Sequence, residues 1–311
     1  MEKNLSKYGY LYILPFFIVF FVFGIYPIFY TLYLSFTRYS GFTDPVFIGF
    51  DNYSLVFTDE LFWRSLTNTF WIWGVNFALQ ISLAFFLVML FSDLEYKIRG
   101  LNIFRIIYYL PNLIAATSVA LIFNRILDRN YGVINRLLFE FGLISQPIGW
   151  LDTTILAQFS VSSIQTWMWF GNTFILFIAT VKAINKETIE SAVIDGANRI
   201  QIMRFVMIPM IKPIVIYVAI TGLIGGLQLF ELPLLITDGL GAPNGGLNTV
   251  ILYLFNQAFR FNNFGYAAAI AYVLFLIILG LSTIFLITIN LSDIKEVGRK
   301  FRRNRLVKTH E

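Results

Sequence analysis

Six apolar runs, each long enough to cross a lipid bilayer as a helix, constrain this sequence more than any other feature. A hydrocarbon core of about 30 Å is spanned by about 20 apolar residues in an α-helix. The runs cover residues 10–36, 68–91, 103–123, 155–181, 214–236 and 266–291, and no soluble domain fits between them. We therefore predict an all-α, polytopic membrane protein with six transmembrane helices, in which residues 1–311 form a single domain.

The composition agrees with a membrane environment. Of the 311 residues, 58% are hydrophobic and only 13% are charged, whereas about 25% are charged in an average soluble domain. The net charge of +5 is not gathered on a soluble basic face, because the Lys and Arg residues lie between the apolar runs. We therefore expect no nucleic-acid partner.

Few residues are suited to catalysis or metal binding. The chain has no Cys, and its single His is the penultimate residue, His310. A disulfide framework and a cysteine nucleophile are therefore excluded, and the usual general base is missing. The sequence also lacks the Gly-x-x-x-x-Gly-Lys-Ser/Thr loop that cradles nucleotide phosphates. We predict a protein that is not an enzyme, with no catalytic residue, metal or cofactor, and any ATP must be bound by another subunit.

The distribution of basic residues predicts the orientation in the membrane. If both termini are cytoplasmic, 17 of the 23 Lys and Arg residues, Lys97 and Arg99 among them, fall on the inner side and six on the outer side. The basic tail, residues 295–308, is expected to lie on anionic membrane lipid, with a nucleic-acid patch as the alternative. We predict a multi-pass protein of the cell (inner) membrane with both termini in the cytoplasm.

Three loops on the predicted outer side are rich in Gly, Pro, Asn and aromatic residues. They cover residues 40–52, 128–152 and 237–263. Connections of nearly 30 residues are long for inert turns, so we expect the loops to form a docking surface for a partner. The alternative is that they are simple connectors.

The inner loop, residues 182–213, carries the most specific pattern. Its residues 186–199 read Lys-Glu-Thr-Ile-Glu-Ser-Ala-Val-Ile-Asp-Gly-Ala-Asn-Arg. Asn185 or Thr188 is placed to cap a short helix that carries Glu187 and Glu190 in its first turns. Small residues after that helix would let another surface approach closely, and Pro213 would start the next membrane span.

This loop resembles the EAA loop of ABC importer permeases, in which Glu-Ala-Ala is followed after three residues by Gly and, nine residues later, by Ile-x-Leu-Pro. Glu190, Ala192, Gly196 and Pro209 match at the right spacing, while Ser191, Val206 and Ile208 are small or isosteric replacements. In the family this loop forms a coupling helix seated in a groove of the ATPase. The resemblance implies ATPase-coupling roles for Glu190, Ser191, Ala192, Asp195, Gly196, Ala197 and Pro209.

The rest of the chain resembles carbohydrate-type permeases, specifically the first permease of the maltose/multiple-sugar heterodimer. Similar stretches cover residues 12–36, 49–53, 109–111, 132–138 and 237–253, although Thr-x-Gly-Gly-Pro is altered at 237–243. The resemblance implies the type I ABC importer architecture and import of a sugar, preferably an oligosaccharide, by alternating access. It implies four kinds of partner besides lipid: a homologous second permease, two ATP-binding subunits, an extracellular solute-binding protein and the sugar itself.

A sugar path needs hydrogen-bonding groups together with flat aromatic faces. In the fourth apolar run, Gln165, Met168, Trp169 and Asn172 fall on one helical stripe. In the fifth, glycines leave room on one face. The predicted path residues are Gln165, Met168, Trp169, Asn172, Gly222, Gly226, Gln228, Phe230 and Glu231. Tight helix packing would use the same amides and glycines, Glu231 is equally suited to a solvated interface, and packing is the preferred role for Asn68, Asn76 and Gln80.

Two other functions are alternatives: an ion-coupled sugar carrier acting alone and a membrane scaffold protein. Such a carrier usually keeps ionisable residues at mid-membrane, whereas Glu231 and Arg105 lie near the ends of their apolar runs. A scaffold has no reason to carry Glu190, Gly196 and Pro209 at these spacings. The sequence therefore favours the importer permease.

Overall fold

The computed structural model describes residues 2–91 and 100–307, and the side chains of 10–91 and 100–288. Lys97, Arg99 and the end of the basic tail, predicted on the inner side, lie outside these residues or side chains. The regular elements of the described chain are helices, as predicted, apart from one short hairpin. It divides into two compact units, Met1–Arg64 with Tyr253–Leu276 and Ser65–Leu252 with Ile277–Glu311.

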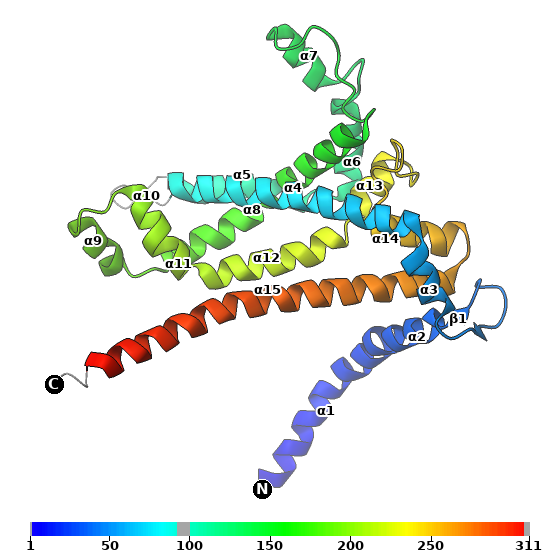
Figure 1. Ribbon diagram of the computed structural model, residues 1–311, viewed down its shortest axis with the longest axis horizontal. Coiled ribbons are helices and arrows are strands. Elements are labelled where there is room, and N and C mark those ends of the chain that lie inside the picture. The colour runs from blue at the N-terminus through cyan, green and yellow to red at the C-terminus, as the bar shows by residue number, and fades with distance from the viewer. Residues whose placement is uncertain (1, 92–99, 308–311) are drawn as a thin grey trace. The chain divides into compact units, whose positions relative to one another are not determined.

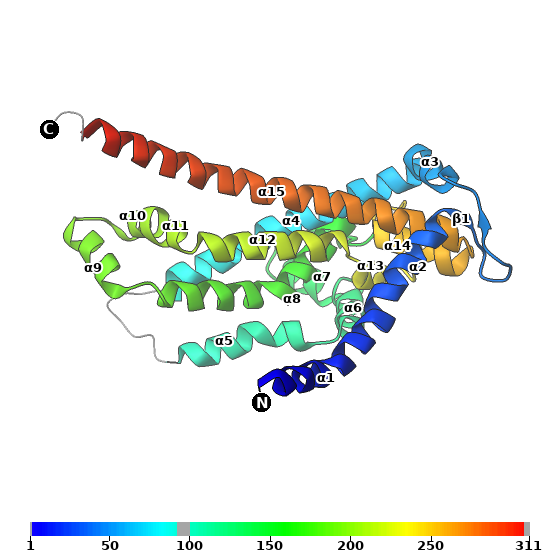
Figure 2. The same cartoon turned by 90° about the horizontal axis from the view of Figure 1, so that it is seen from below.

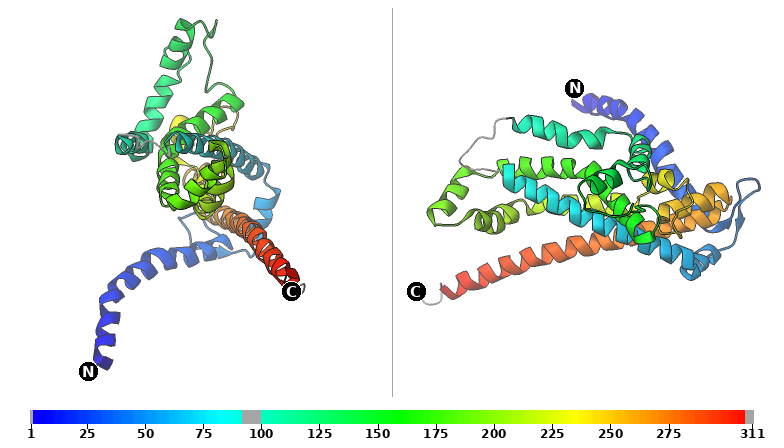
Figure 3. Two further views of the ribbon diagram at one scale, coloured as in Figure 1. Left: turned by 90° about the vertical axis from the view of Figure 1, so that its left-hand side faces the viewer. Right: turned by 90° about the horizontal axis from the view of Figure 1, so that it is seen from above.

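The first unit begins with a long apolar helix. Its elements are α1 (Glu2–Phe20), a π-helical turn (Phe21–Ile25), α2 (Tyr26–Ser35), the antiparallel strands β1 (Thr37–Arg38) and β2 (Val46–Phe47), α3 (Asp51–Thr58) and the starts of α4 (Glu60–Phe91) and α15 (Phe264–Val307). Figure 3 shows α1 and α2 as one continuous, curved rod. In the helical stretch Tyr10–Ser35, none of the 18 residues of its most apolar part is buried in the described structure. The apolar side chains of this part are therefore available to lipid or to another protein.

A carboxylate ties three elements of this unit together. Asp59, which precedes α4, accepts hydrogen bonds on one oxygen from the hydroxyls of Tyr253 and Tyr266, and on the other from the backbone N–H of Leu61 at 2.9 Å. Burial acts to raise the pKa of Asp59, but these hydrogen bonds outweigh it and hold the pKa below its usual value. Burial and the bond to Asp59 raise the pKa of Tyr253 to about 12.

The second unit contains the remaining helices. They are α5 (Leu101–Tyr109), a 3₁₀ turn (Leu110–Leu113), α6 (Ala116–Ile126), α7 (Val133–Glu140), α8 (Thr154–Lys182), α9 (Lys186–Ile194), α10 (Arg199–Ile202), a π-helical turn (Met203–Met207), α11 (Ile208–Met210), α12 (Lys212–Leu227), α13 (Glu231–Ile236) and the start of α14 (Val250–Phe255). The end of α14 and the π-helical turn that follows it (Asn256–Arg260) belong to the first unit. Within the second unit, α5 and α12 run beside α8, and α6 packs on α13 (Figures 1 and 2).

The predicted spans correspond to observed helices, except that the third is bent and the fifth is interrupted at residues 228–230. Within residues 2–91 and 100–307, five helical segments are long and apolar enough to cross a membrane: Tyr10–Ser35, Glu60–Phe91, Thr154–Lys182, Lys212–Ile236 and Phe264–Thr288. The third run, predicted as one helix over 103–123, is instead broken into Leu101–Leu113 and Ala116–Ile126 at an angle of 92°. Pro111 lacks a backbone N–H, and Ile114 is extended with ψ of 131°, so the helical hydrogen bonds stop there.

Polar side chains join α4 to α8 in a regular ladder. Gln158 donates to Asn68 at 3.0 Å, and Thr166 donates to Asn76 at 3.1 Å. Between them, Ser162 donates to the carbonyl of Ile72 at 3.0 Å. The partners in each rung are 90 residues apart, so the two helices run parallel. Because α4 and α8 run in the same direction, the chain between them has to cross the membrane once to return to its starting side. The bent pair α5–α6 lies between them in the chain and therefore makes this crossing.

Two apolar clusters fill the second unit. One includes Leu87, Phe174, Phe177, Ile189, Ile202, Met207 and Ile211 from α4, α8 and the segments α9 to α11, and the other includes Ile72, Val161, Ile164, Met168, Leu229, Leu232 and Leu247. Where lipid is the alternative environment, such side chains stabilise the unit by close van der Waals packing and not by removal from water. The clusters hold α8 at both ends and position the side chains in its middle.

Candidate functional site

A cavity of about 700 Å³ lies in the second unit, enclosed by residues of α4, α6, α8, α12, α13 and α14. All nine residues predicted for the sugar path line it. Its wall is mostly amide, hydroxyl, aromatic and glycine, and Glu231 carries the one carboxylate among the described lining residues. A cavity of this size is large enough for a small ligand, and its amide and hydroxyl groups suit a polar one.

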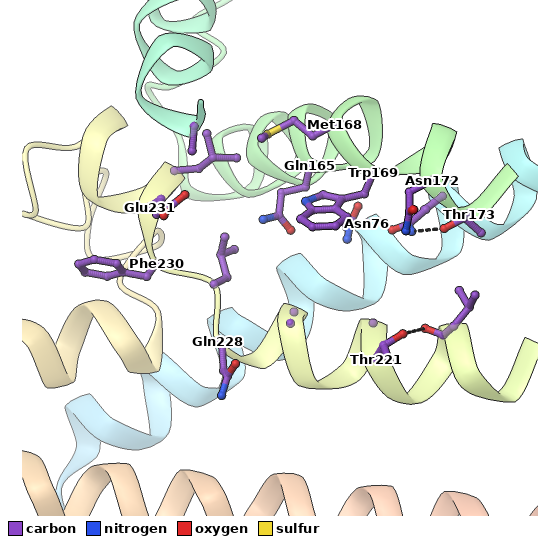
Figure 4. Close-up of a pocket in the computed structure, with 18 of the residues that line it drawn as sticks. Asn76, Gln165, Met168, Trp169, Asn172, Thr173, Thr221, Gln228, Phe230 and Glu231 are labelled. Carbon is purple, nitrogen blue, oxygen red and sulfur yellow. Dashed lines mark hydrogen bonds between the residues drawn. The ribbon is translucent and has the colours of Figure 1, made fainter. Parts of the chain in front are cut away.

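The stripe on α8 forms one wall. Gln165, Met168, Trp169 and Asn172 all line the cavity, and Figure 4 shows Gln165 and Trp169 projecting to the same side of the helix. Among the described residues, the side-chain amides of Gln165 and Asn172 have no hydrogen-bond partner, so their donors and acceptors are available to a ligand in the cavity. Met168 is 8% exposed and also belongs to an apolar cluster.

The opposite wall is a break in a membrane span. Helix α12 ends at Leu227 and α13 begins at Glu231, and the residues between are not helical: Phe230 has φ of −138° and ψ of −55°. The freed carbonyl of Leu229 accepts a hydrogen bond from the Thr249 hydroxyl at 2.7 Å. Irregular backbone at membrane depth is tolerated where it is buried in protein or lines a cavity, and this break places Gln228, Phe230 and Glu231 in the cavity wall.

The glycines of α12 have different neighbours. A Cβ on Gly226 would lie 1.9 Å from the Trp73 ring, so this glycine permits close packing of α12 on α4. A Cβ on Gly222 would meet the Phe77 ring at 3.4 Å, which is a tight contact, whereas Gly225 faces open space. The packing interpretation therefore applies to Gly226 although it also lines the cavity.

Besides Tyr217, four polar lining residues were not predicted for the path. Asn76 and Gln80 were assigned to packing and do pack, since Asn76 accepts from Thr166 and Gln80 donates to Thr173 at 2.6 Å, but both also line the cavity. Thr173 and Thr221 complete the set. The spacing of four residues between Asn76 and Gln80 puts both on the face of α4 that meets α8 and so predicted their packing, but it does not indicate that they also face a cavity.

The inner loop forms a capped helix. The side chain of Asn185, one of the two predicted caps, accepts from the backbone N–H of Glu187 at 3.2 Å and begins α9. At its other end, Gly196 has φ of +81°, and the N–H groups of Gly196 and Ala197 donate to the carbonyls of Val193 and Ala192, both at 3.0 Å. This is a Schellman cap, whose left-handed position favours glycine.

The predicted coupling residues divide into two groups. Glu190, Ser191, Asp195, Gly196 and Pro209 are exposed, whereas Ala192 and Ala197 are half-buried against one of the apolar clusters. The small size of the two alanines is therefore explained by packing within the subunit, and Gly196 remains the residue with open space above it.

The loop also displays apolar side chains. Ile194 is 85% exposed, Phe205 is 69% exposed and Ile200 is 67% exposed. The neighbouring Ile189 and Ile202 are buried and anchor the loop, and Arg199 donates to the carbonyl of Met89 at the end of α4. An anchored helix pair with an exposed apolar surface is typical of a protein–protein docking site.

The segment 128–152 is ordered by one amide. Asn135, which is 5% exposed, donates to the carbonyls of Arg129 and Ile148 and accepts from the backbone N–H of Ile148 and the indole of Trp150, at 2.8–3.2 Å. The backbone N–H groups of Tyr131 and Asn130 hold the pKa of Asp128 below its usual value. Figures 1 and 3 show that α7 of this segment stands out from the other helices of its unit.

Comparison with known proteins gives a consistent set of relatives. No family model matches the chain. The chain is 36% identical to "Probable ABC transporter permease protein YesP" of Bacillus subtilis, over 92% of this chain and 90% of that protein. It is 33% identical to the lactose transport system permease protein LacF of Rhizobium radiobacter, over 90% and 95% of the two chains, and 29% identical to the trehalose/maltose transport system permease protein MalF of Thermococcus litoralis, over 98% and 100%.

Solved structures share the fold. A chain of a bacterial ABC transporter involved in the import of the acidic polysaccharide alginate superposes with a TM-score of 0.77 at 24% identity, covering 92% of this chain and 96% of that one. A second structure, the alginate transporter in complex with a periplasmic protein bound to an alginate pentasaccharide, gives a TM-score of 0.76 at 22% identity.

Proposed function

Because the chain belongs to the permease subunits of sugar ABC importers, we propose that the cavity beside α8 is its part of the sugar path. Family membership places ATP hydrolysis on separate subunits and disfavours both alternatives, the lone carrier and the scaffold. The observation that carries the proposal is the pair of amides, Gln165 and Asn172, that face the cavity beside the Trp169 ring. We further propose an oligosaccharide as cargo, and one permease domain over residues 1–311.

The chemistry of the wall suits a pyranose. A sugar ring presents hydroxyls at its rim and C–H groups on its faces, so it is bound by amides and by flat aromatic surfaces together. Trp169 and Phe230 supply aromatic faces from opposite walls, and Gln165 and Asn172 supply both donors and acceptors. Gly225 also lines the cavity, and a Cβ at this position would meet nothing within 4 Å, so the wall leaves space here for a sugar ring.

Removing either amide of α8 should slow uptake. Gln165→Ala or Asn172→Ala removes a hydrogen bond worth about 0.5–1.5 kcal/mol, or roughly two- to tenfold in the transport efficiency. Uptake of labelled saccharides by proteoliposomes containing the full importer measures this, with Ser163→Ala, which lies on α8 outside the cavity, as the control. Unchanged uptake and unchanged sugar preference in both amide variants would place the path elsewhere.

We propose that the loop 182–213 couples this subunit to its ATPase. The exposed face formed by Glu190, Ser191, Asp195, Gly196 and Pro209 would meet the ATPase groove, with Ala192 and Ala197 supporting it from beneath. The complete importer would contain a homologous second permease, two ATP-binding subunits and an extracellular solute-binding protein that docks on the loops 40–52, 128–152 and 237–263. Closure of the ATPase on ATP would draw the two coupling helices together and change the side to which the cavity opens.

The proposed orientation has both termini in the cytoplasm, and it is testable by single cysteines because the chain has none. Asn52 is a poor probe site since its buried amide holds the carbonyls of Ser35 and Thr37. Phe42, Leu143 and Leu240 are 83%, 69% and 72% exposed. Cysteines there should react with a membrane-impermeant thiol reagent on intact cells.

Cysteines at positions 194 and 300 should be spared in the same cells and react once the membrane is dissolved in detergent that denatures the complex. Reaction at 194 and 300 in intact cells, with protection at 42, 143 and 240, would invert the orientation. The loop 182–213 would then lie on the wrong side to meet a cytoplasmic ATPase.

A further inference from the structure

The described wall of the cavity carries negative charge without any positive charge. Among the described lining residues none is Lys, Arg or His, and the only carboxylate is that of Glu231. The other polar groups of the wall are amides, hydroxyls and an indole, which bind neutral hydroxyl groups well and offer no compensating positive charge. An anionic ligand in this part of the path would therefore meet a like charge with no partner.

Glu231 is held in the wall by the break in its membrane span. It is the first residue of α13, directly after the non-helical residues 228–230, and Leu229 and Leu232 on either side are 5% and 2% exposed. The buried neighbours fix the backbone at this point, while the Glu231 side chain is exposed to the cavity. Figure 4 shows it on the same side of the cavity as Phe230.

We propose that Glu231 makes this half of the path select neutral over anionic saccharides. The inference rests on the proposed function, because it requires sugar to pass this cavity. Two like charges repel strongly at close range in a partly dehydrated site, whereas a carboxylate accepts hydrogen bonds from neutral sugar hydroxyls. The subunit thereby discriminates uronate-containing oligosaccharides from neutral ones by an unfavourable contact as well as by favourable ones.

The test uses pairs of trisaccharides that differ only at C6, such as α-1,4-linked galactotriose with trigalacturonate and maltotriose with its triuronate. The pair used for binding is the one whose neutral trisaccharide the wild-type importer takes up faster. Equilibrium binding to the purified, complete importer in nanodiscs without the solute-binding protein then gives the two dissociation constants. Glu60→Gln is a matched control, because Glu60 is also an exposed carboxylate at the first position of a helix but does not line the cavity.

We expect Glu231→Gln to lower the ratio of the uronate to the neutral dissociation constant about tenfold, and Glu231→Lys to make the uronate bind more tightly than it binds to the wild type. Glu60→Gln should leave the ratio unchanged. Copurification of the ATPase reports whether each variant assembles.

An unchanged ratio in both Glu231 variants, while Gln165→Ala still weakens binding of the neutral trisaccharide, overturns the inference and leaves the proposed function standing. If neither Gln165→Ala nor Asn172→Ala alters binding of the neutral trisaccharide, the sugar does not use this cavity. The proposed path and the inference then fall together.

Discussion

Replacing Gly196 with aspartate should abolish transport while the subunit is still inserted in the membrane. At φ of +81° this residue closes the Schellman cap of α9, a left-handed position that aspartate, like asparagine, tolerates better than most L-residues, so we expect the effect to come mainly from the added side chain. The new side chain would enter the open space above Gly196, where the proposed coupling loop meets the ATPase. Uptake, ATPase copurification and the amount of subunit in the membrane are the measurements.

Two further substitutions separate backbone strain from contact. Gly196→Ala adds little volume but keeps the strain, whereas Gly196→Asn tolerates the left-handed conformation and adds a side chain nearly as large as aspartate. If contact dominates, the asparagine variant should transport less than the alanine variant, and the reverse order would assign the effect to the cap. Normal uptake by Gly196→Asp at normal expression would contradict the coupling assignment itself.

Gly171→Ala should prevent the subunit from reaching a stable fold. Gly171 lies in the middle of α8, and a Cβ there would sit 1.8 Å from the backbone carbonyl oxygen of Tyr108 in α5. Backbone cannot turn aside as a flexible side chain can, so α5 and α8 would have to separate. Overpacking of this kind typically costs about 1–3 kcal/mol and sometimes more. The yield of folded protein in mild detergent and its melting temperature measure the loss.

The matched control is Gly74→Ala in α4. A Cβ on Gly74 meets nothing within 4 Å, and alanine is favoured over glycine in a helix by roughly 0.5–1 kcal/mol. We expect this variant to melt at the same temperature as the wild type or slightly above it. Equal stability of the Gly171→Ala and Gly74→Ala variants would show that α5 and α8 do not approach as closely as described.

The sequence predicted the spans well where helical packing is simple, and less well where the backbone is broken. Hydropathy reports how apolar a segment is, and it cannot distinguish one straight helix from two helices that meet at an angle. The run 103–123 was therefore predicted as a single helix, although Pro111 already indicated a place where helical hydrogen bonds are lost. The break at 228–230 contains no proline itself, but Pro233 has no N–H to donate to the carbonyl of Leu229 four residues earlier, so here too a proline indicated where a helical hydrogen bond is lost.

The cavity residues show a similar division. The spacing of Gln165 and Asn172 along α8 predicted a shared face, and both line the cavity. The roles of Asn76 and Gln80 could not be separated from the sequence, because one amide can bond to a neighbouring helix and face a cavity at the same time. Gly226 is the converse case, since the Trp73 ring that occupies its free side lies about 150 residues earlier in the chain.

The exposed isoleucines and phenylalanine of the inner loop have a consequence for the biogenesis of the importer. Ile194, Ile200 and Phe205 remain uncovered in the isolated subunit, and uncovered apolar side chains in an aqueous compartment promote aggregation and capture by chaperones. On the proposed coupling, the ATPase covers these side chains in the complete importer, and an orphan copy of the permease leaves them exposed. We therefore expect membrane proteases to remove copies made in excess of the other subunits.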